Sequence, residues 1–384
     1  MFIAHTGYLE LFDLVVKHIL PGMGLFFYFV LHFNCKFAAR KEREKRIMSL
    51  PREEVLKAFH NQEVEHVPVS FWRHFAKNEF GDVYQDPTIR DANIEGHKQY
   101  VKDLDFDFSK TMLDGYFPYP FRGVENPRDL DDLANLVPLE EDDPWIQDQV
   151  ALAKEQNQIV GDLPTFITVF SPLILLKWAQ IDHTKESILT SDVKFADLYE
   201  KNPERVEQAL QVIAVDQGKV VRALKKGTEV DGIYYSTQSI QDPREDNLEF
   251  FKKVMEPIDL IVQEEINRNF DLNILHVCGF AGAYNHLEWF TNYPLQVINW
   301  ATLTDGVPLG EGKKLFGDRP VLGGFDNSIK GLLYTGTKEE IQQNVRNLID
   351  EAGKKGVILG ADCTVPRDTP YDHLRWVIEA ARDY

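Results

Sequence analysis

Short apolar runs alternate with longer amphipathic segments from residue 50 to the end of the chain. Eight of these runs have the length and composition of buried strands, and they span residues 67–71, 106–113, 165–170, 231–235, 274–277, 296–300, 321–325 and 356–360. Strands that alternate with helices form parallel sheets, so this pattern predicts an α/β fold, specifically a (β/α)8 TIM barrel. A doubly wound sheet is the alternative, although no Gly-rich phosphate loop follows the first run.

The segments between the runs are mostly helical in pattern. Residues 205–224 and 250–270 place apolar side chains at helical spacing, and Thr337 with Glu340 forms a capping box ahead of another helix. A last helix is predicted to start at Thr369-Pro370, because proline is favoured in the first turn. Residues 126–156 are acidic and punctuated by proline, and we expect them to form a solvated excursion.

Composition narrows the function. The chain has 384 residues, and 61 acidic against 42 basic side chains give a net charge of −19, which argues against nucleic-acid binding. Apolar content of 43% is that of a globular protein with a large core. Three cysteines cannot form a disulfide framework in a chain of this length. These features predict a cytoplasmic enzyme.

The first 47 residues differ from the rest. They contain an apolar stretch, 19–35, then a basic stretch, 36–46, and their 7 Lys/Arg and 4 Asp/Glu give +3. We therefore divide the chain into a leader, 1–47, and an enzyme domain, 48–384. The leader is expected to be dispensable, with Met48 as a candidate start. A membrane contact, or a helix that belongs to the fold, are the alternatives.

Histidine and cysteine occur together at two predicted strand ends. His276 and Cys278 are two residues apart, so their side chains point to the same side of the strand, and Cys363 follows the last run. The carboxyl ends of barrel strands meet at one mouth, so these three side chains should converge there. One His and two Cys suit tetrahedral Zn²⁺ with an open fourth position, as in catalytic sites. Two buried thiols and a hydrogen-bonded histidine are the alternative.

Other candidate side chains follow the same strand ends, where barrel enzymes carry their catalytic groups. The candidates for substrate binding are Trp72, Arg73, His74, Asp114, Tyr116 and Asn327, and those for catalysis are Ser236, Asp326 and Asp362. Asp362 or Asp326 is expected to orient His276, as carboxylates do for metal-bound histidines. An ordinary polar rim is the alternative for Arg73, Asp114 and Ser236.

These motifs resemble the uroporphyrinogen decarboxylase superfamily over residues 50–384. The specific stretches are Leu275-His-Val-Cys-Gly279, Gly323-Gly-Phe-Asp-Asn327, Gly360-Ala-Asp-Cys-Thr-Val-Pro366 and Thr369-Pro370. One branch of the superfamily decarboxylates uroporphyrinogen without a metal. The other holds zinc methyltransferases, which move a methyl group between a methylcobamide (corrinoid) protein and a thiol such as coenzyme M. Their H-x-C…C zinc signature is matched by His276, Cys278 and Cys363.

The decarboxylase pattern is matched poorly. Its arginine pair, four residues apart, corresponds to Arg73 and Lys77, and its essential aspartate falls at Lys110, with the opposite charge. Its tyrosine falls near Trp178, its late histidine at or beside Cys363, and only its serine is kept, as Ser236. A substrate with eight carboxylates needs several cations, so the resemblance favours the methyltransferase branch.

The expected function is zinc-dependent methyl transfer from a corrinoid protein, or another methyl donor, to a small-molecule thiol. The first alternative is decarboxylation of uroporphyrinogen or a related porphyrin-like acid. The second is a non-catalytic protein that binds zinc or a corrinoid. The expected partners are the thiol and the corrinoid protein, and a homodimer is compatible with the sequence.

Overall fold

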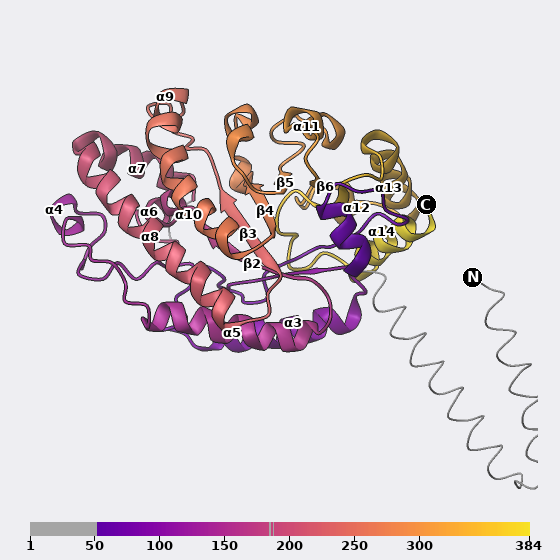
Figure 1. Ribbon diagram of the computed structural model, residues 1–384, viewed down its shortest axis with the longest axis horizontal. Coiled ribbons are helices and arrows are strands. Elements are labelled where there is room, and N and C mark those ends of the chain that lie inside the picture. Colours follow the sequence, from indigo (N-terminus) through magenta and orange to yellow (C-terminus); the bar gives the residue numbers. More distant parts are fainter. Residues whose placement is uncertain (1–51, 184–185, 187) are drawn as a thin grey trace, which may run out of the picture. The chain divides into compact units, whose positions relative to one another are not determined.

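The computed structural model describes residues 52–183, 186 and 188–384. The leader, 1–47, lies outside the described residues. The chain between 51 and 384 is one compact unit. Its centre is a curled sheet of seven parallel strands in the order β1 to β7 (Figure 1). They are β1 (Ser109–Thr111), β2 (Thr165–Phe170), β3 (Gly232–Thr237), β4 (Leu272–Val277), β5 (Val297–Trp300), β6 (Val321–Phe325) and β7 (Val357–Ala361).

The first predicted strand, 67–71, forms a single parallel bridge instead of a full strand, between Val69 and Leu359 of β7. Ser70 N–H donates to the Leu359 carbonyl at 3.1 Å. On its other side, the Val69 carbonyl accepts from Asp107 N–H, also at 3.1 Å. The segment is therefore hydrogen-bonded both to β7 and to the residues that lead into β1. The fold is α/β with a parallel sheet of the TIM-barrel-like kind.

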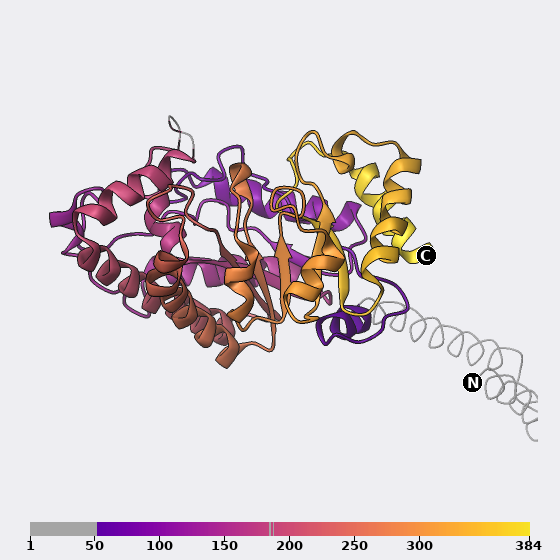
Figure 2. The ribbon, with the colours of Figure 1, turned by 90° about the horizontal axis from the view of Figure 1, so that it is seen from above.

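Helices lie on the outer face of the sheet (Figures 1 and 2). The helix α8 packs against α5 and α10, and α13 packs against α14. Besides residues 52–59, the helical elements are α3 (Thr88–Asp103), α4 (Leu130–Leu133), α5 (Pro144–Val160), α6 (Pro172–Trp178), α7 (Thr190–Lys201), α8 (Pro203–Gly227), α9 (Leu248–Phe250), η1 (Phe251–Met255), α10 (Glu256–Asn269), η2 (Phe280–Gly282), η3 (Leu287–Asn292), α11 (Leu309–Leu315), α12 (Leu332–Thr335), α13 (Lys338–Ala352) and α14 (Tyr371–Asp383).

The helix signals in the sequence are confirmed with local differences. The capping box of Thr337 and Glu340 is formed at the start of α13. Pro370 is the N-cap of α14, so the helix begins at Tyr371, one residue later than predicted. The predicted helix 250–270 opens into a π-helical turn, η1, before α10. Pro257 explains this opening, because it has no N–H to donate to the preceding turn.

The prediction of a solvated excursion at 126–156 is wrong in its second half. Pro144–Val160 forms α5, which packs against α3 and α8. Trp145 and Leu152 are buried, and the Asp143 carboxylate accepts from Trp145 N–H to cap the helix. The acidic residues lie ahead of α5 rather than on its buried face, so overall composition concealed an amphipathic helix.

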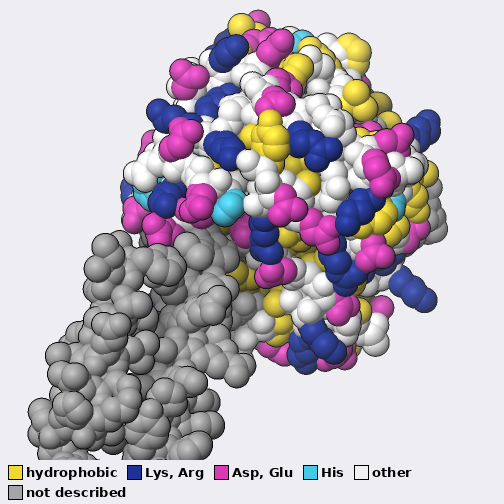
Figure 3. All heavy atoms as spheres, turned by 90° about the vertical axis from the view of Figure 1, so that its right-hand side faces the viewer, with side chains coloured by type: hydrophobic (Ala, Val, Ile, Leu, Met, Phe, Trp, Pro, Cys, Tyr) yellow, Lys and Arg dark blue, Asp and Glu magenta, His cyan; other side chains and the backbone are white. Residues whose placement is uncertain are grey.

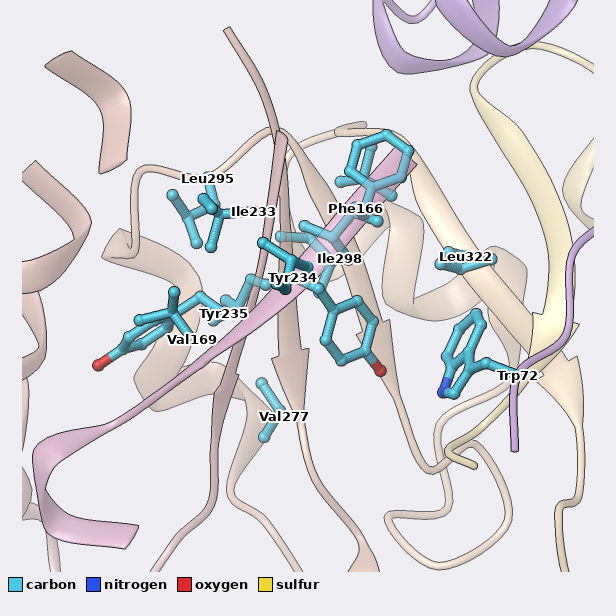
Figure 4. Packing of buried hydrophobic residues seen from close by; sticks show 14 of the residues in the cluster. Trp72, Phe166, Val169, Ile233, Tyr234, Tyr235, Val277, Leu295, Ile298 and Leu322 are labelled. Atoms are coloured by element: carbon cyan, nitrogen blue, oxygen red, sulfur yellow. The ribbon is translucent and has the colours of Figure 1, made fainter. Parts of the chain in front are cut away.

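Successive side chains of β3 show how the curled sheet separates its inner face from the helix layer (Figure 4). The Tyr234 hydroxyl donates to Asn299 on β5 at 2.8 Å, and its ring lies 5.3 Å from the ring of Trp72. The next residue, Tyr235, points the other way and donates to Asp259 on α10 at 2.7 Å. This alternation follows from the two-residue period of a strand. It places Tyr234, and residues in phase with it, at the interior where a site can form.

The surface drawn in Figure 3 carries Lys/Arg and Asp/Glu side chains interspersed. Among the residues that the structure describes, no helix combines the length and the apolar character needed to cross a bilayer.

Candidate metal centre and active site

His276, Cys278 and Cys363 converge at the carboxyl ends of β4 and β7, as predicted. Their ligand atoms all lie within 4.8 Å of one another. The two Sγ atoms are 3.8 Å apart, which leaves both cysteines as free thiols, since a disulfide bond is about 2.05 Å long. Within the described part of the chain, these three side chains form a cluster that could hold a metal ion.

The geometry of this cluster fits a zinc ion. Two sulfurs bound to zinc at about 2.3 Å with a tetrahedral angle are ~3.8 Å apart, which matches the Cys278–Cys363 separation. Both ring nitrogens of His276 are buried and have no hydrogen-bond partner among the described residues. A buried imidazole normally bonds at least one partner, so His276 has one ligand position to offer. The cluster supplies three ligands and leaves the fourth position open.

The two thiols influence each other. Their mutual hydrogen bond is the main reason why the pKa of Cys363 lies well below that of an ordinary thiol. The same interaction raises the pKa of Cys278 well above its usual range. One thiolate is therefore stabilised by the other thiol, and ionisation of both requires a nearby cation. A metal ion between the two sulfurs would meet that requirement.

A buried polar network holds the loop that carries Cys278. Gln238 donates to the carbonyls of Cys278 and Phe280, at 2.9 and 3.2 Å. Its own carbonyl accepts from Lys177 at 2.7 Å, and Lys177 also pairs with Asp192 at 3.0 Å. Because Lys177, Asp192 and Gln238 are all buried, this network fixes the loop position.

Gly279 is required at the turn after Cys278. A Cβ atom at this position would lie 2.3 Å from Cβ of Ala301, which is far inside contact distance. Asn285 donates to the Cys278 carbonyl at 3.1 Å from the other end of the same loop. The glycine of the His-Val-Cys-Gly motif is thus explained by packing beside the metal ligand.

The predicted orientation of His276 by Asp362 or Asp326 is wrong. Asp362 is buried and accepts from the Thr302 hydroxyl at 2.9 Å, and burial raises the pKa of its carboxyl to about 8. Asp326 accepts from the backbone and hydroxyl of Ser328. A third carboxyl group, that of Asp305, accepts from Asn285 N–H at 2.8 Å, and burial raises its pKa to about 6. Both aspartates follow strand ends, but their side chains are taken up by the neighbouring loops.

A cavity of about 310 Å³, at the small end of ligand pockets, is lined in part by the three candidate metal ligands. Aromatic side chains form a large part of its wall. The aromatic lining is Trp72, Phe80, Phe117, Phe170, Trp178, Tyr234 and Phe280, and the polar lining includes His74, Lys110, Ser236, Gln238, Asn327 and Arg367. The predicted residues Trp72, His74, Ser236 and Asn327 therefore do face the cavity.

Lys110 on β1 is one of the cavity residues that the sequence-based site prediction missed, and it carries the only ammonium group among the described residues that line the cavity. It is buried, and its Nζ lies 5.0 Å from the centre of the Tyr234 ring and 5.9 Å from that of Trp72. Burial lowers the pKa of its ammonium group to about 8. The signal was present, because a single lysine interrupts the apolar run 106–113. Charged residues rarely occupy buried strands without a function.

His74, which lines the cavity, and Asp114 form a hydrogen-bonded pair. The His74 Nδ1 lies 2.6 Å from Asp114 Oδ1, and Phe75 N–H donates to the other carboxylate oxygen at 2.9 Å. Burial raises the pKa of Asp114, but its bonds to His74, Phe75 and Ala76 outweigh that effect and leave the pKa below its usual value. An ionised Asp114 can only accept, so Nδ1 carries the hydrogen and Nε2 is left as an acceptor.

Three predicted substrate residues do not line the cavity. The Arg73 guanidinium donates to the Tyr371 hydroxyl at 2.7 Å and stacks on the Tyr371 and Tyr100 rings. Tyr116 packs edge-on against Tyr84. Asp114 does not line the cavity itself but is hydrogen-bonded to His74, which does. Arg73 was expected to bind substrate because it follows a strand end, but its side chain turns outward toward α14.

The fold and the metal-ligand cluster define an α/β protein with a candidate metal centre at the carboxyl ends of its strands. The family model described as uroporphyrinogen decarboxylase (URO-D) matches residues 109–384. The match covers more than half of the chain, so the chain belongs to the uroporphyrinogen decarboxylase family.

Two solved structures are similar at low identity. One is a B12-independent methionine synthase from Shewanella sp. W3-18-1 in complex with selenomethionine, with 14% identity, a TM-score of 0.48, and coverage of 83% of this chain and 97% of that one. The other is a beta-mannanase from the blue mussel Mytilus edulis, with 10% identity, a TM-score of 0.42, and coverage of 83% and 92%. Neither likeness is close enough to support an argument about function. A search of curated proteins finds no match.

Proposed function

We propose that this chain is a zinc-dependent enzyme that transfers a methyl group to a thiol, on a barrel closed by the segment 67–71. The observation that carries the proposal is the ligand cluster of His276, Cys278 and Cys363, with sulfurs 3.8 Å apart and an unpartnered buried imidazole. Three ligands of this kind are typical of catalytic rather than structural zinc. When bound, zinc supplies a Lewis acid that lowers the pKa of a thiol ligand, so that the thiol reacts as thiolate near neutral pH.

The residues around the cluster have assignable tasks. Gln238 and Asn285 hold the Cys278 backbone, and the aromatic wall around Trp72 keeps water away from the sulfur. In the transfer, the carbon–sulfur bond forms as the bond between the methyl group and its donor breaks, and the electron pair of that bond stays on the donor. The proposed donor is a corrinoid protein that docks over the mouth of the cavity.

The thiol proton must leave before the transfer, and His74 is the group that can accept it. Its Nδ1 is held by Asp114, so Nε2 is the free basic nitrogen at the cavity wall. The negative charge of Asp114 stabilises the imidazolium that forms. Histidine and aspartate thus act as one unit, with His74 taking the proton and Asp114 orienting the ring.

The test combines metal analysis with a transfer assay. The protein, purified without chelator, should contain about one zinc per chain, with Zn–S distances near ~2.3 Å by X-ray absorption. Methylcobalamin as a free donor and 2-mercaptoethanol as acceptor should then give a methyl thioether and reduced cobalamin, detected by mass spectrometry and absorbance. A protein that contains no zinc and takes up none would overturn the proposal.

Decarboxylation of uroporphyrinogen is the second candidate, because the family model carries that name. Two observations oppose it. Lys110 stands where the decarboxylases are expected to have an aspartate, and Arg73 is stacked on Tyr371 instead of facing the cavity. Zinc-independent formation of coproporphyrinogen from uroporphyrinogen III, at an enzymatic rate, would favour this candidate over methyl transfer.

A further inference from the structure

Lys110 is a buried cation that forms no salt bridge within the described part of the chain. Its one hydrogen bond is a weak one, to the thioether sulfur of Met112 at 3.2 Å. The negative charges that attract it, at Cys363, Asp114 and Cys278, act without a direct hydrogen bond. The Asp114 carboxylate is already bonded to His74 and to two backbone N–H groups. Buried charges are normally paired, since an unpaired one has lost its hydration without compensation.

Lys177 makes the contrast clear. It is also buried, on α6, yet it bonds both Asp192 and Gln238 at 3.0 and 2.7 Å. The chain thus pairs one buried lysine fully and leaves the other facing a cavity. The difference assigns Lys177 to structure and Lys110 to a ligand.

Two aromatic rings aim the Lys110 ammonium group at the cavity. Trp72, which follows the segment 67–71, and Tyr234 of β3 point toward one another (Figure 4), and the lysine Nζ lies over both rings. Ring faces attract a cation but do not neutralise its charge. The remaining wall of the cavity is largely apolar, and the metal cluster lies in the same cavity.

We propose that Lys110 is the anion-binding residue of this cavity, so that its ligand is a small molecule with an oxyanion on a mainly apolar body. The anion site goes beyond the proposed function. It rests on that function only in identifying the anionic ligand with the thiol substrate. Carboxylate, sulfonate and phosphate share the required chemistry, because a lysine binds each of them as a point charge.

The first experiment needs neither metal nor turnover. Benzoate and benzamide have nearly the same shape and differ in charge, so their affinities are compared by calorimetry on zinc-free full-length protein at pH 7, with benzenesulfonate and phenyl phosphate as further arms. Benzoate should bind at least about tenfold more tightly than benzamide, as expected for a charge-assisted hydrogen bond in a buried site. The strongest of the three anions identifies the head group.

Lys110→Met should abolish the preference for benzoate, and Lys110→Arg should keep most of it. Lys98→Met, which removes an exposed lysine paired with Glu95, is the control and should bind benzoate like the wild type. Circular dichroism and thermal unfolding establish that each variant is folded. If the folded wild type binds benzoate and benzamide equally, or if Lys110→Met keeps the preference, the proposal is wrong.

A second experiment separates this proposal from the proposed function. Cobalt(II)-loaded protein is titrated with 4-mercaptobenzoate and 4-mercaptobenzamide, and binding of sulfur to the metal is followed by its charge-transfer absorption. A Lys110-dependent preference for the benzoate without any sulfur-to-cobalt band would support the anion site and contradict thiol activation. If both thiols give the sulfur-to-cobalt band and bind with equal affinity, the result would support thiol activation and contradict the anion site.

Discussion

Two groups of residues at the cavity differ in how directly they follow from the sequence. The first group, the metal wall, consists of His276, Cys278 and Cys363, which come together as their positions at two strand ends predicted. In the second group, the Lys110 wall, Arg73 turns away, Asp114 acts through His74, and Lys110 faces the cavity. The residues of the metal wall are positioned by strand direction, whereas the Lys110 wall depends on how long side chains pack.

The comparison shows which kind of residue can be placed from sequence. His276 and Cys278 are short side chains in the same phase of one strand, so the strand fixes where their ligand atoms lie. Arginine and lysine have long, flexible side chains with many rotamers. Arg73 finds Tyr371 on α14, nearly 300 residues away in the chain, and no local pattern could reveal that contact.

The largest expected effect is on the metal wall. Cys363→Ser should reduce zinc content from about one per chain to near zero, and methyl transfer by more than about a hundredfold, since even partners outside the ligand set cost up to that much. Thr364→Ala, which alters the neighbouring cavity residue without removing a ligand, should keep its zinc. Zinc content is measured by elemental analysis. Full zinc occupancy in folded Cys363→Ser would contradict the assignment of this ligand.

The next effect concerns His97, which holds the backbone of Met112, two residues after Lys110. His97 Nδ1 donates to the Asn93 carbonyl at 2.8 Å, and its Nε2 accepts from Met112 N–H at 3.3 Å, so the ring is neutral. Burial lowers the pKa of His97 to about 4. Because this lies below the unfolded value of about 6.5, the neutral ring contributes stability above pH 6.5, which is lost as the pH falls toward 4.

The loss should amount to about 3 kcal/mol of unfolding free energy between pH 6.5 and 4. Urea unfolding at several pH values measures it, and His97→Gln is the comparison, because glutamine does not titrate in this range. The variant is expected to be less stable at pH 7 but to lose less on acidification. Parallel pH curves for the two proteins would show that His97 is not held neutral.

A smaller effect is expected from Asp114→Asn, which removes the charge but keeps the shape. Methyl transfer should fall by about a hundredfold, because His74 then lacks the anion that stabilises its protonated form. His74→Gln should cost a similar amount, and the double variant no more than either one, since the two residues act as a unit. Steady-state kcat/KM values test this, and strictly additive losses would contradict a shared role.

The smallest effect is expected from Arg73→Met. Its guanidinium is stacked between rings outside the cavity, so ligand affinity should stay within about twofold of the wild type, in contrast to Lys110→Met. The free energy of unfolding should fall by roughly 1 kcal/mol through the lost cation–π contacts. A large loss of benzoate affinity in folded Arg73→Met would reverse the roles assigned to the two cations.

The sequence by itself determined the strands and the positions of the metal ligands. Seven of the eight predicted runs contain strands of the parallel sheet, because a buried strand needs a continuous apolar run whatever lies around it. The capping box of α13 was equally readable, since both of its residues lie within one turn. The convergence of Cys363 with Cys278 followed from strand direction, which places the carboxyl ends of the strands at one mouth.

Only the tertiary structure decided which polar side chains enter the cavity and which are taken up elsewhere. Asp362 is hydrogen-bonded to Thr302 and Arg73 to Tyr371, while Lys177 is paired with Asp192. Lys110 forms no salt bridge with the described residues. Each outcome depends on a partner far away in the chain. A charge in a buried strand is visible in the sequence, but whether it is paired depends on contacts that form only when the strands and helices have packed.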